Sequence, residues 1–147
     1  MPTTKQILSI DSLADIDGES TRDVGLVRRV MLFAGDDPAD DIQVKSLLDM
    51  SAKEYMQYSK PYKLAKRAAT VGVNNSDGTI QVGAYVVKVP STRDLMNLTN
   101  DGKMREQIIR LTNVTDFETV SIEDYFGLED AVNFFYQDAL SEETLSE

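Results

Sequence analysis

The stretch Ser121–Leu140, which reads SIEDYFGLEDAVNFFYQDAL, decides how this chain folds. Ser121 and Asp124 have the S-x-x-D spacing of a capping box, which predicts that a helix begins here. At 100° per residue, the large apolar side chains fall within about half of the helical wheel. They are Ile122, Tyr125, Phe126, Leu128, Val132, Phe135, Tyr136, Ala139 and Leu140. The sequence therefore predicts a long amphipathic helix over about residues 121–140.

One aromatic residue interrupts this pattern. Phe134 projects from the polar side of the predicted helix, about opposite the apolar arc. It is either a surface aromatic that contacts another part of the same chain or a contact for a partner protein. The candidate partner-binding residues are Phe134, Tyr136 and Phe126 in this helix and Phe33 in an earlier segment.

Composition excludes several classes of function. The 147 residues include 25 acids and 15 bases, and the resulting net charge of −10 argues against nucleic acid and anionic membranes as partners. The absence of cysteine and histidine removes disulfides, thiolate ligands and the usual general base. Neither a signal peptide nor an apolar run of about 20 residues is present. We therefore expect a cytoplasmic protein that is not an enzyme and has no catalytic, metal or cofactor site and no small-molecule substrate.

The first third of the chain predicts an arm followed by helices. Residues 1–21 are polar and turn-rich, which predicts a flexible N-terminal arm. Residues 22–34 predict a helix that is apolar on several sides, with a buried strand as the alternative. Residues 42–50 are compatible with either helix or strand. Ser51 and Glu54 form a capping box for a short helix that follows.

Two charged clusters need an interpretation. Four acids lie close together at Asp36, Asp37, Asp40 and Asp41, but their spacing lacks the pattern and the glycine of a calcium loop. We interpret them as helix-capping and solvated residues, with Asp37 as the cap and Pro38 at the first helical position. The basic KLAKRA segment at residues 63–68 follows, in a helix that restarts at Pro61. It is interpreted as a solvated helix face, too short to bind nucleic acid.

The strongest β signal covers residues 69–89. Apolar and polar residues alternate from Ala69 to Val73, and the turn-forming run NNSDG precedes a second, longer strand at residues 79–89. Two strands alone are marginal, so helices must cover the hairpin. Ser91 and Asp94 again have the S-x-x-D spacing and predict a helix over residues 91–98. A break at Asn100–Gly102 and a further helix from Met104 are predicted after it. The predicted protein is α+β and mainly α, with one domain over residues 22–140 and an acidic tail at 141–147.

From Tyr85 onward the chain resembles the small tail assembly chaperones of contractile-tailed bacteriophages, the Mu-like family. Members typically have a strand ending in P-T-x-x-D-L, a helix ending in L-x-G-L, and then L-D-x-x-D-Y-x-x-L-x-x-x-x-x-x-F. The residues matching that pattern are Pro90, Thr92, Asp94, Leu95, Leu111, Val114, Val120, Asp124, Tyr125, Leu128 and Phe135. Asn113 replaces the family's glycine and can take the left-handed cap conformation. The resemblance covers about residues 85–140 and leaves residues 1–67 outside it.

This resemblance implies a protein that acts by binding. Such chaperones hold the tape-measure protein, a very long, helical and hydrophobic chain that sets tail length, until tube subunits assemble around it. The implied partner is a tape-measure, tail or baseplate protein, the implied place of action is the host cytoplasm, and self-association into a homo-oligomer is a further expectation. Exposed aromatic residues and a strong net charge suit this work.

A second function from the same setting is a virion structural protein of the tail, neck or baseplate. Its expected marker is the N-terminal arm, which would become ordered only on a neighbouring subunit, and its place would be the virion tail. An unrelated adaptor domain is a further alternative.

Overall fold

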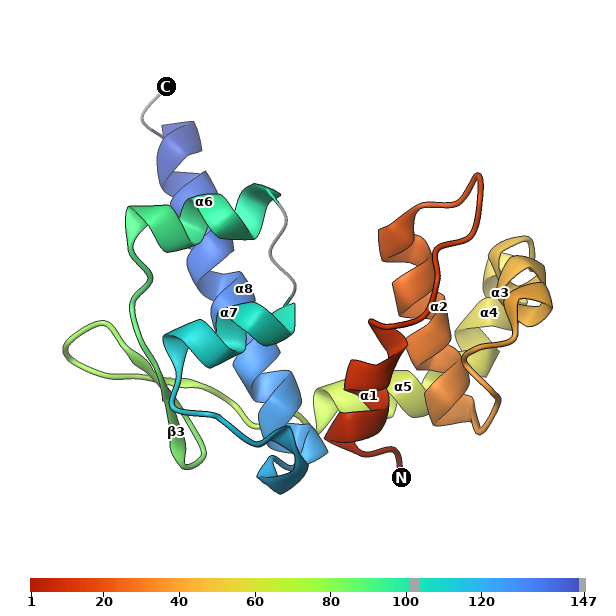
Figure 1. The fold of residues 1–147 in the computed structure, drawn as a ribbon, viewed down its shortest axis with the longest axis horizontal. Helices are drawn as coiled ribbons and strands as arrows, with labels where there is room; N and C mark the ends of the chain where they lie inside the picture. Colours follow the sequence, from red (N-terminus) through yellow and green to blue (C-terminus); the bar gives the residue numbers. More distant parts are fainter. Residues whose placement is uncertain (101–103, 146–147) are drawn as a thin grey trace. The chain divides into compact units, whose positions relative to one another are not determined.

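The computed structural model describes residues 1–100 and 104–145, with side chains for residues 1–96 and 104–137. The protein is α+β and mainly α, as the sequence predicts, with one small antiparallel sheet among the described residues. The chain divides into two compact units, residues 1–68 and residues 69–147 (Figure 1). This division differs from the single domain expected over residues 22–140. Each unit is built from elements that are neighbours in the sequence.

The first unit is a cluster of five helices around α2. The helices are α1 (Thr4–Ile10), α2 (Thr21–Ala34), α3 (Asp41–Leu48), α4 (Ala52–Tyr58) and α5 (Lys60–Arg67). Helix α2 contacts α1, α3 and α5, which explains why its sequence is apolar on several sides. The core of the first unit contains Ile16, Val24, Val27, Met31, Val44 and Leu47. The strand alternatives for the α2 and α3 segments are therefore wrong.

The expected flexible arm is also wrong. Thr3 begins α1 with a capping box, in which its side chain accepts from the Gln6 N–H and the Gln6 side chain accepts from the Thr3 N–H. Ile7, Ile10 and Ile16 are buried. These isoleucines are too few to give a clear amphipathic pattern, but burying them is sufficient to hold the segment on the unit.

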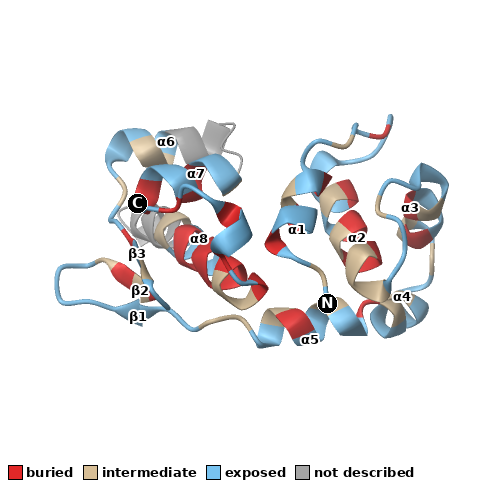
Figure 2. Ribbon diagram, turned by 60° about the horizontal axis from the view of Figure 1, so that its bottom comes forward, coloured by how far each residue is buried: buried red, intermediate tan, exposed pale blue. Residues whose placement is uncertain are grey.

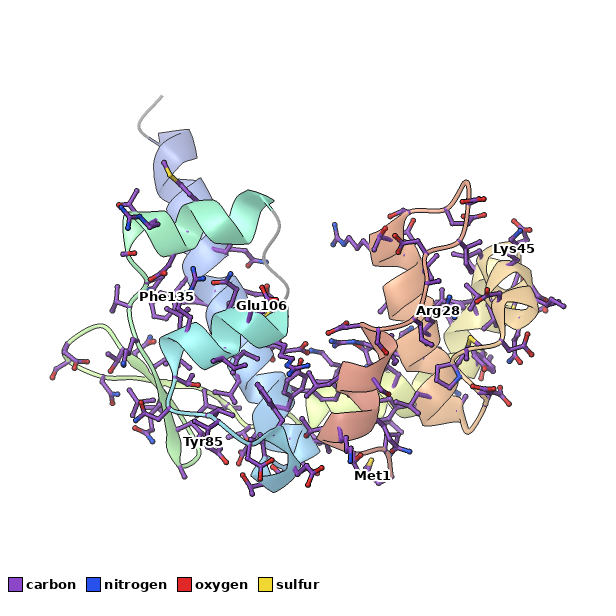
Figure 3. All side chains as sticks on the ribbon, viewed as in Figure 1. Met1, Arg28, Lys45, Tyr85, Glu106 and Phe135 are labelled. Atoms are coloured by element: carbon purple, nitrogen blue, oxygen red, sulfur yellow. The ribbon has the colours of Figure 1, made fainter. Side chains whose placement is uncertain are left out.

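Arg28 connects two loops and the start of α3 inside the first unit. Its guanidinium is buried and donates to the carbonyl oxygens of Ala14 at 3.0 Å and Pro38 at 2.6 Å (Figure 3). It also pairs with the Asp41 carboxylate at 2.8 Å. The expected cap at Asp37 is wrong, because residues 37–39 form a turn and α3 begins at Asp41 after the Asp40 cap.

The second unit places a small sheet and three helices beside one another. The strands are β1 (Val73–Asn74), β2 (Ile80–Val82) and β3 (Tyr85–Val87), and the helices are α6 (Thr92–Asn100), α7 (Met104–Leu111) and α8 (Ile122–Leu145), with a 3₁₀ turn at Phe117–Thr119. The predicted long second strand is therefore two strands. Gly83, at φ +55°, forms a tight turn with Ala84, and this reverses the chain.

Strand register separates an inner from an outer sheet face. Ile80 pairs with Val87, and both are buried with Val82. On the opposite face, Gln81 lies between Val73 and Val86, which are exposed. The first strand begins only at Val73, so the segment from Ala69 to Gly72 is not a strand.

Helix α8 covers the inner sheet face. The Thr70 N–H donates to the Glu123 carbonyl at 3.0 Å, and the Thr70 hydroxyl donates to the Asp124 carboxylate at 2.6 Å. A Cβ on Gly127 would lie 2.5 Å from the Thr70 carbonyl oxygen and 2.7 Å from Val82 Cγ1. Glycine at this position therefore permits the close approach. Most positions in the first half of α8 are buried, as Figure 2 shows.

Helix ends in the second unit agree with most of the predicted caps. Ser91 and Asp94 form a complete capping box, and the Ser91 N–H lowers the pKa of Asp94, with Arg110 adding to the effect. Asp124 N–H donates to the Ser121 hydroxyl at 3.1 Å. The left-handed conformation expected at Asn113 is absent, since only glycines among the described residues have positive φ.

The ends of α6 and α8 differ from expectation as far as they are described. The predicted break at Asn100–Gly102 falls largely on residues 101–103, outside the described residues. Helix α8 continues to Leu145, five positions beyond its predicted end, so most of the expected acidic tail is helical backbone.

Replacing Arg28 by methionine tests the role of its buried guanidinium. Arg28→Met should lower the free energy of unfolding by about 2–4 kcal/mol, because the Ala14 and Pro38 carbonyl oxygens lose their donor. The measurement is urea unfolding followed by circular dichroism. Asp41→Asn is the control and should cost less than about 1 kcal/mol, because the Asp41 side chain is 59% exposed. Equal losses in both variants would contradict this role.

Two glycine-to-alanine substitutions should have opposite effects. Gly127→Ala should destabilise by about 1–3 kcal/mol, since its Cβ meets backbone at Thr70. Gly25→Ala, in α2, has nothing within 4 Å of the added Cβ and should stabilise by about 0.5–1 kcal/mol through helix propensity. Thermal unfolding of both variants beside the parent chain measures the difference. A neutral Gly127→Ala would show that α8 and the Thr70 segment are not tightly packed.

Candidate functional site

The second half of α8 presents aromatic side chains that the core does not fully cover. The apolar residues up to Val132 are buried, whereas Phe134 is 50% exposed and Phe135 and Tyr136 are half-buried. The Phe134 and Phe135 rings meet edge to face, with centroids 6.1 Å apart (Phe135 is labelled in Figure 3). We call Phe134, Phe135 and Tyr136 the aromatic end of α8. It leaves apolar side chains exposed or half-exposed on the helix.

Helical periodicity explains why these residues differ from those before them. Tyr125, Leu128 and Val132 follow one stripe that is buried in the second unit. Phe134 lies about 200° around the helix from Val132, so it leaves that stripe and faces away from it. Asp130 is exposed one turn before Phe134, on the same side of α8. The exposed face thus has one large aromatic residue beside acidic and amide side chains.

The four predicted partner-binding residues have different surroundings. Phe134 and Tyr136 both belong to the aromatic end of α8, but they lie two positions apart and therefore on different sides of the helix. Phe126 is completely buried and its ring packs 6.4 Å from that of Tyr125, so its assignment to a partner surface is wrong. Its position on the apolar arc placed it in the core stripe. Phe33 belongs to the first unit, where its ring makes an edge contact with Tyr62 at 5.5 Å.

A second exposed face was not among the predicted sites. Along α5, Lys60, Lys63, Leu64 and Arg67 are all exposed, and Leu64 is 62% exposed. Their i, i+3, i+4, i+7 spacing places them on one side of the helix. Ala65 is buried on the other side, with Tyr62 half-buried. The sequence KPYKLAKR contained the signal for this face. Its prediction as a solvated helix face did not account for the exposed Leu64.

The acidic cluster of the first unit is used by the fold. The Asp36 carboxylate accepts from the Tyr58 hydroxyl and from the Gln43 amide, and the Tyr58 contact in particular lowers the pKa of Asp36. Burial and the neighbouring Asp36 raise the pKa of Tyr58. Asp40 caps α3 and Asp41 pairs with Arg28. Among the residues described, no group of three or more acidic, cysteine or histidine side chains is arranged to hold a metal ion.

Comparison with known proteins gives no assignment. No protein-family model matches the chain, and no curated protein or solved structure matches it. Within the described part of the chain, every helix is too short or too polar to cross a membrane.

Truncating two phenylalanines of α8 separates surface from core. Phe134→Ala should change the free energy of unfolding by less than about 1 kcal/mol, because the ring is half-exposed and alanine favours the helix. Phe126→Ala should cost about 3–5 kcal/mol, as expected for a fully buried ring. Chemical unfolding of the two variants measures both values. A loss at Phe134 as large as that at Phe126 would show that Phe134 belongs to the core.

Proposed function

We propose that this protein is a phage tail assembly chaperone that works by binding, without bond-making chemistry. Its partner is a helical, apolar segment of the tape-measure protein, or of a baseplate protein, held in the host cytoplasm before tail tube assembly. The observation that carries the proposal is the half-exposed Phe134, on a helix whose preceding apolar residues are all buried.

The geometry suits recognition of another helix. An exposed aromatic residue on a rigid helix provides apolar area at little cost in conformational entropy, and helices commonly bind through anchors of this kind. The Phe135 ring, which meets the Phe134 ring edge to face, enlarges the apolar contact. Exposed apolar surface of this kind is a marker of protein–protein contact.

Charge supports the same proposal. Residues 69–147 contain 14 acids and 5 bases, a net charge of −9, whereas residues 1–68 contain 11 acids and 10 bases, a net charge of −1. The unit with the aromatic end therefore has most of the negative charge. A strong net charge keeps a complex with an apolar partner dispersed in solution.

The order of elements in the second unit is compatible with the family resemblance. A strand is followed by a helix with a capping box at Ser91 and Asp94, then by α7 and the long α8. The arm that would favour a virion structural protein is instead α1, buried within its own unit through Ile7 and Ile10. We therefore propose the chaperone alone.

Co-expression tests the proposal. The chain is produced with tagged fragments of the tape-measure protein encoded in the same genome, and soluble complexes are isolated through the tag. The chain should co-purify with an apolar helical fragment, and Phe134→Ala should abolish this while leaving the far-ultraviolet circular dichroism unchanged. Asn133→Ala, a neighbouring exposed position, is the matched control and should still bind. Detection of the chain in purified virions, with no soluble complex, would contradict the chaperone proposal.

A further inference from the structure

The exposed side of α5 combines positive charge with one apolar residue. Lys60, Lys63 and Arg67 surround Leu64 on a single face of the helix. Among the described residues, no carboxylate lies within ion-pair distance of these three cations. We call the four residues the basic face of α5. It is held in place from behind, because α5 packs on α2 and Tyr62 contacts Phe33.

Charges of opposite sign are separated along the sequence. No acid occurs between Tyr55 and Ser76, a stretch that contains four bases, all in α5. From residue 111 to the end there are ten acids and no base. The exposed side of α8 in that second stretch has Asp130 and Phe134 one turn apart. Each helix therefore presents one large apolar side chain, Leu64 among cations on α5 and Phe134 near Asp130 on α8, and the two stretches of sequence have opposite charge.

We propose that the basic face of α5 is a self-association surface that binds the exposed side of α8 around Phe134, in the negatively charged second unit of a second copy of this chain. Leu64 would meet Phe134 at the centre, and the cations at the rim would face the negatively charged second unit. An apolar centre with a charged rim is the usual arrangement of an interface, and opposite potentials bring the two surfaces together.

Charge and shape favour this occupant over nucleic acid or a membrane. A nucleic acid would approach a chain with a net charge of −10, and one eight-residue helix offers only a few phosphate contacts. A helix that lies on a membrane needs a broad apolar side, but Leu64 is the one large hydrophobic side chain that α5 exposes, and Ala65 is buried in its own unit. The second unit, with a net charge of −9, is present in every copy of the chain.

The contact is small and therefore reversible. Two short helix faces bury less than the roughly 1,200–2,000 Å² of a stable interface, so association depends on protein concentration. It also covers Phe134, the residue on which the proposed function rests. Self-association would then protect this aromatic residue until a partner helix displaces the second copy.

Sedimentation equilibrium of the full chain alone tests this proposal. The average mass should rise above that of the monomer with increasing concentration at about 0.1 M salt. It should fall back at about 1 M salt, where the Debye length shrinks from about 10 Å to about 3 Å. A single monomer mass at all concentrations, or an association that strengthens with salt, would overturn it.

Charge reversal with a matched control identifies the surface. The double variant Lys63→Glu, Arg67→Glu should weaken association about tenfold or more. The control Lys45→Glu, Lys53→Glu changes two exposed lysines of α3 and α4, gives the same net charge and should retain association. Equal weakening in both double variants would overturn the proposal, since general repulsion would then explain the loss. So would binding of a labelled oligonucleotide that only the first pair of substitutions removes.

Leu64→Ser and Phe134→Ala should each weaken self-association, and the two together should weaken it no further than the stronger single variant. Additive losses would place the residues in separate contacts and overturn the pairing. The outcome is independent of the co-expression test. A chain that is always monomeric but binds the tape-measure fragment overturns only this inference, whereas a chain that self-associates but does not bind the fragment overturns only the proposed function.

Discussion

The second unit depends on the close approach of α8 to the chain segment that leads into the sheet. Gly127 has no Cβ, so the Thr70 carbonyl and Val82 can come within the distance that any other residue would block. The backbone bond from Thr70 to Glu123 and the hydroxyl bond to Asp124 then fix the register of helix against segment. A sheet of strands only two or three residues long is marginal by itself, and this contact supplies its missing cover.

The same packing decides which aromatic residues of α8 remain available. The core buries the stripe through Tyr125, Phe126 and Val132. Phe134 lies outside that stripe and keeps half of its surface. In the first unit α5 behaves in the same way, because Ala65 faces the core and Leu64 is left outside among lysines and an arginine. In both units the available surface is what remains after one helix side has been buried.

Uneven charge gives these two surfaces different roles. Nearly all of the net negative charge belongs to the second unit, and the most concentrated positive charge lies on α5 of the first. Arg28, by contrast, is a buried cation, and its guanidinium donates to the Ala14 and Pro38 carbonyls and to the Asp41 carboxylate. A charged residue can therefore be judged only by what its fold leaves unpaired.

The sequence by itself determined the elements with strong local signals. The period of 3.6 residues and the Ser121–Asp124 cap predicted α8, and the Ser91–Asp94 pair predicted the start of α6. The same period placed Phe134 on the polar side of α8. These predictions were possible because helix periodicity and capping depend on residues only a few positions apart. Only the tertiary structure decided that α1 is packed, that Phe126 is core, that Gly83 divides one predicted strand into two, and that the chain forms two units. These outcomes depend on contacts between residues far apart in the chain, where burial of a few side chains outweighs the local pattern.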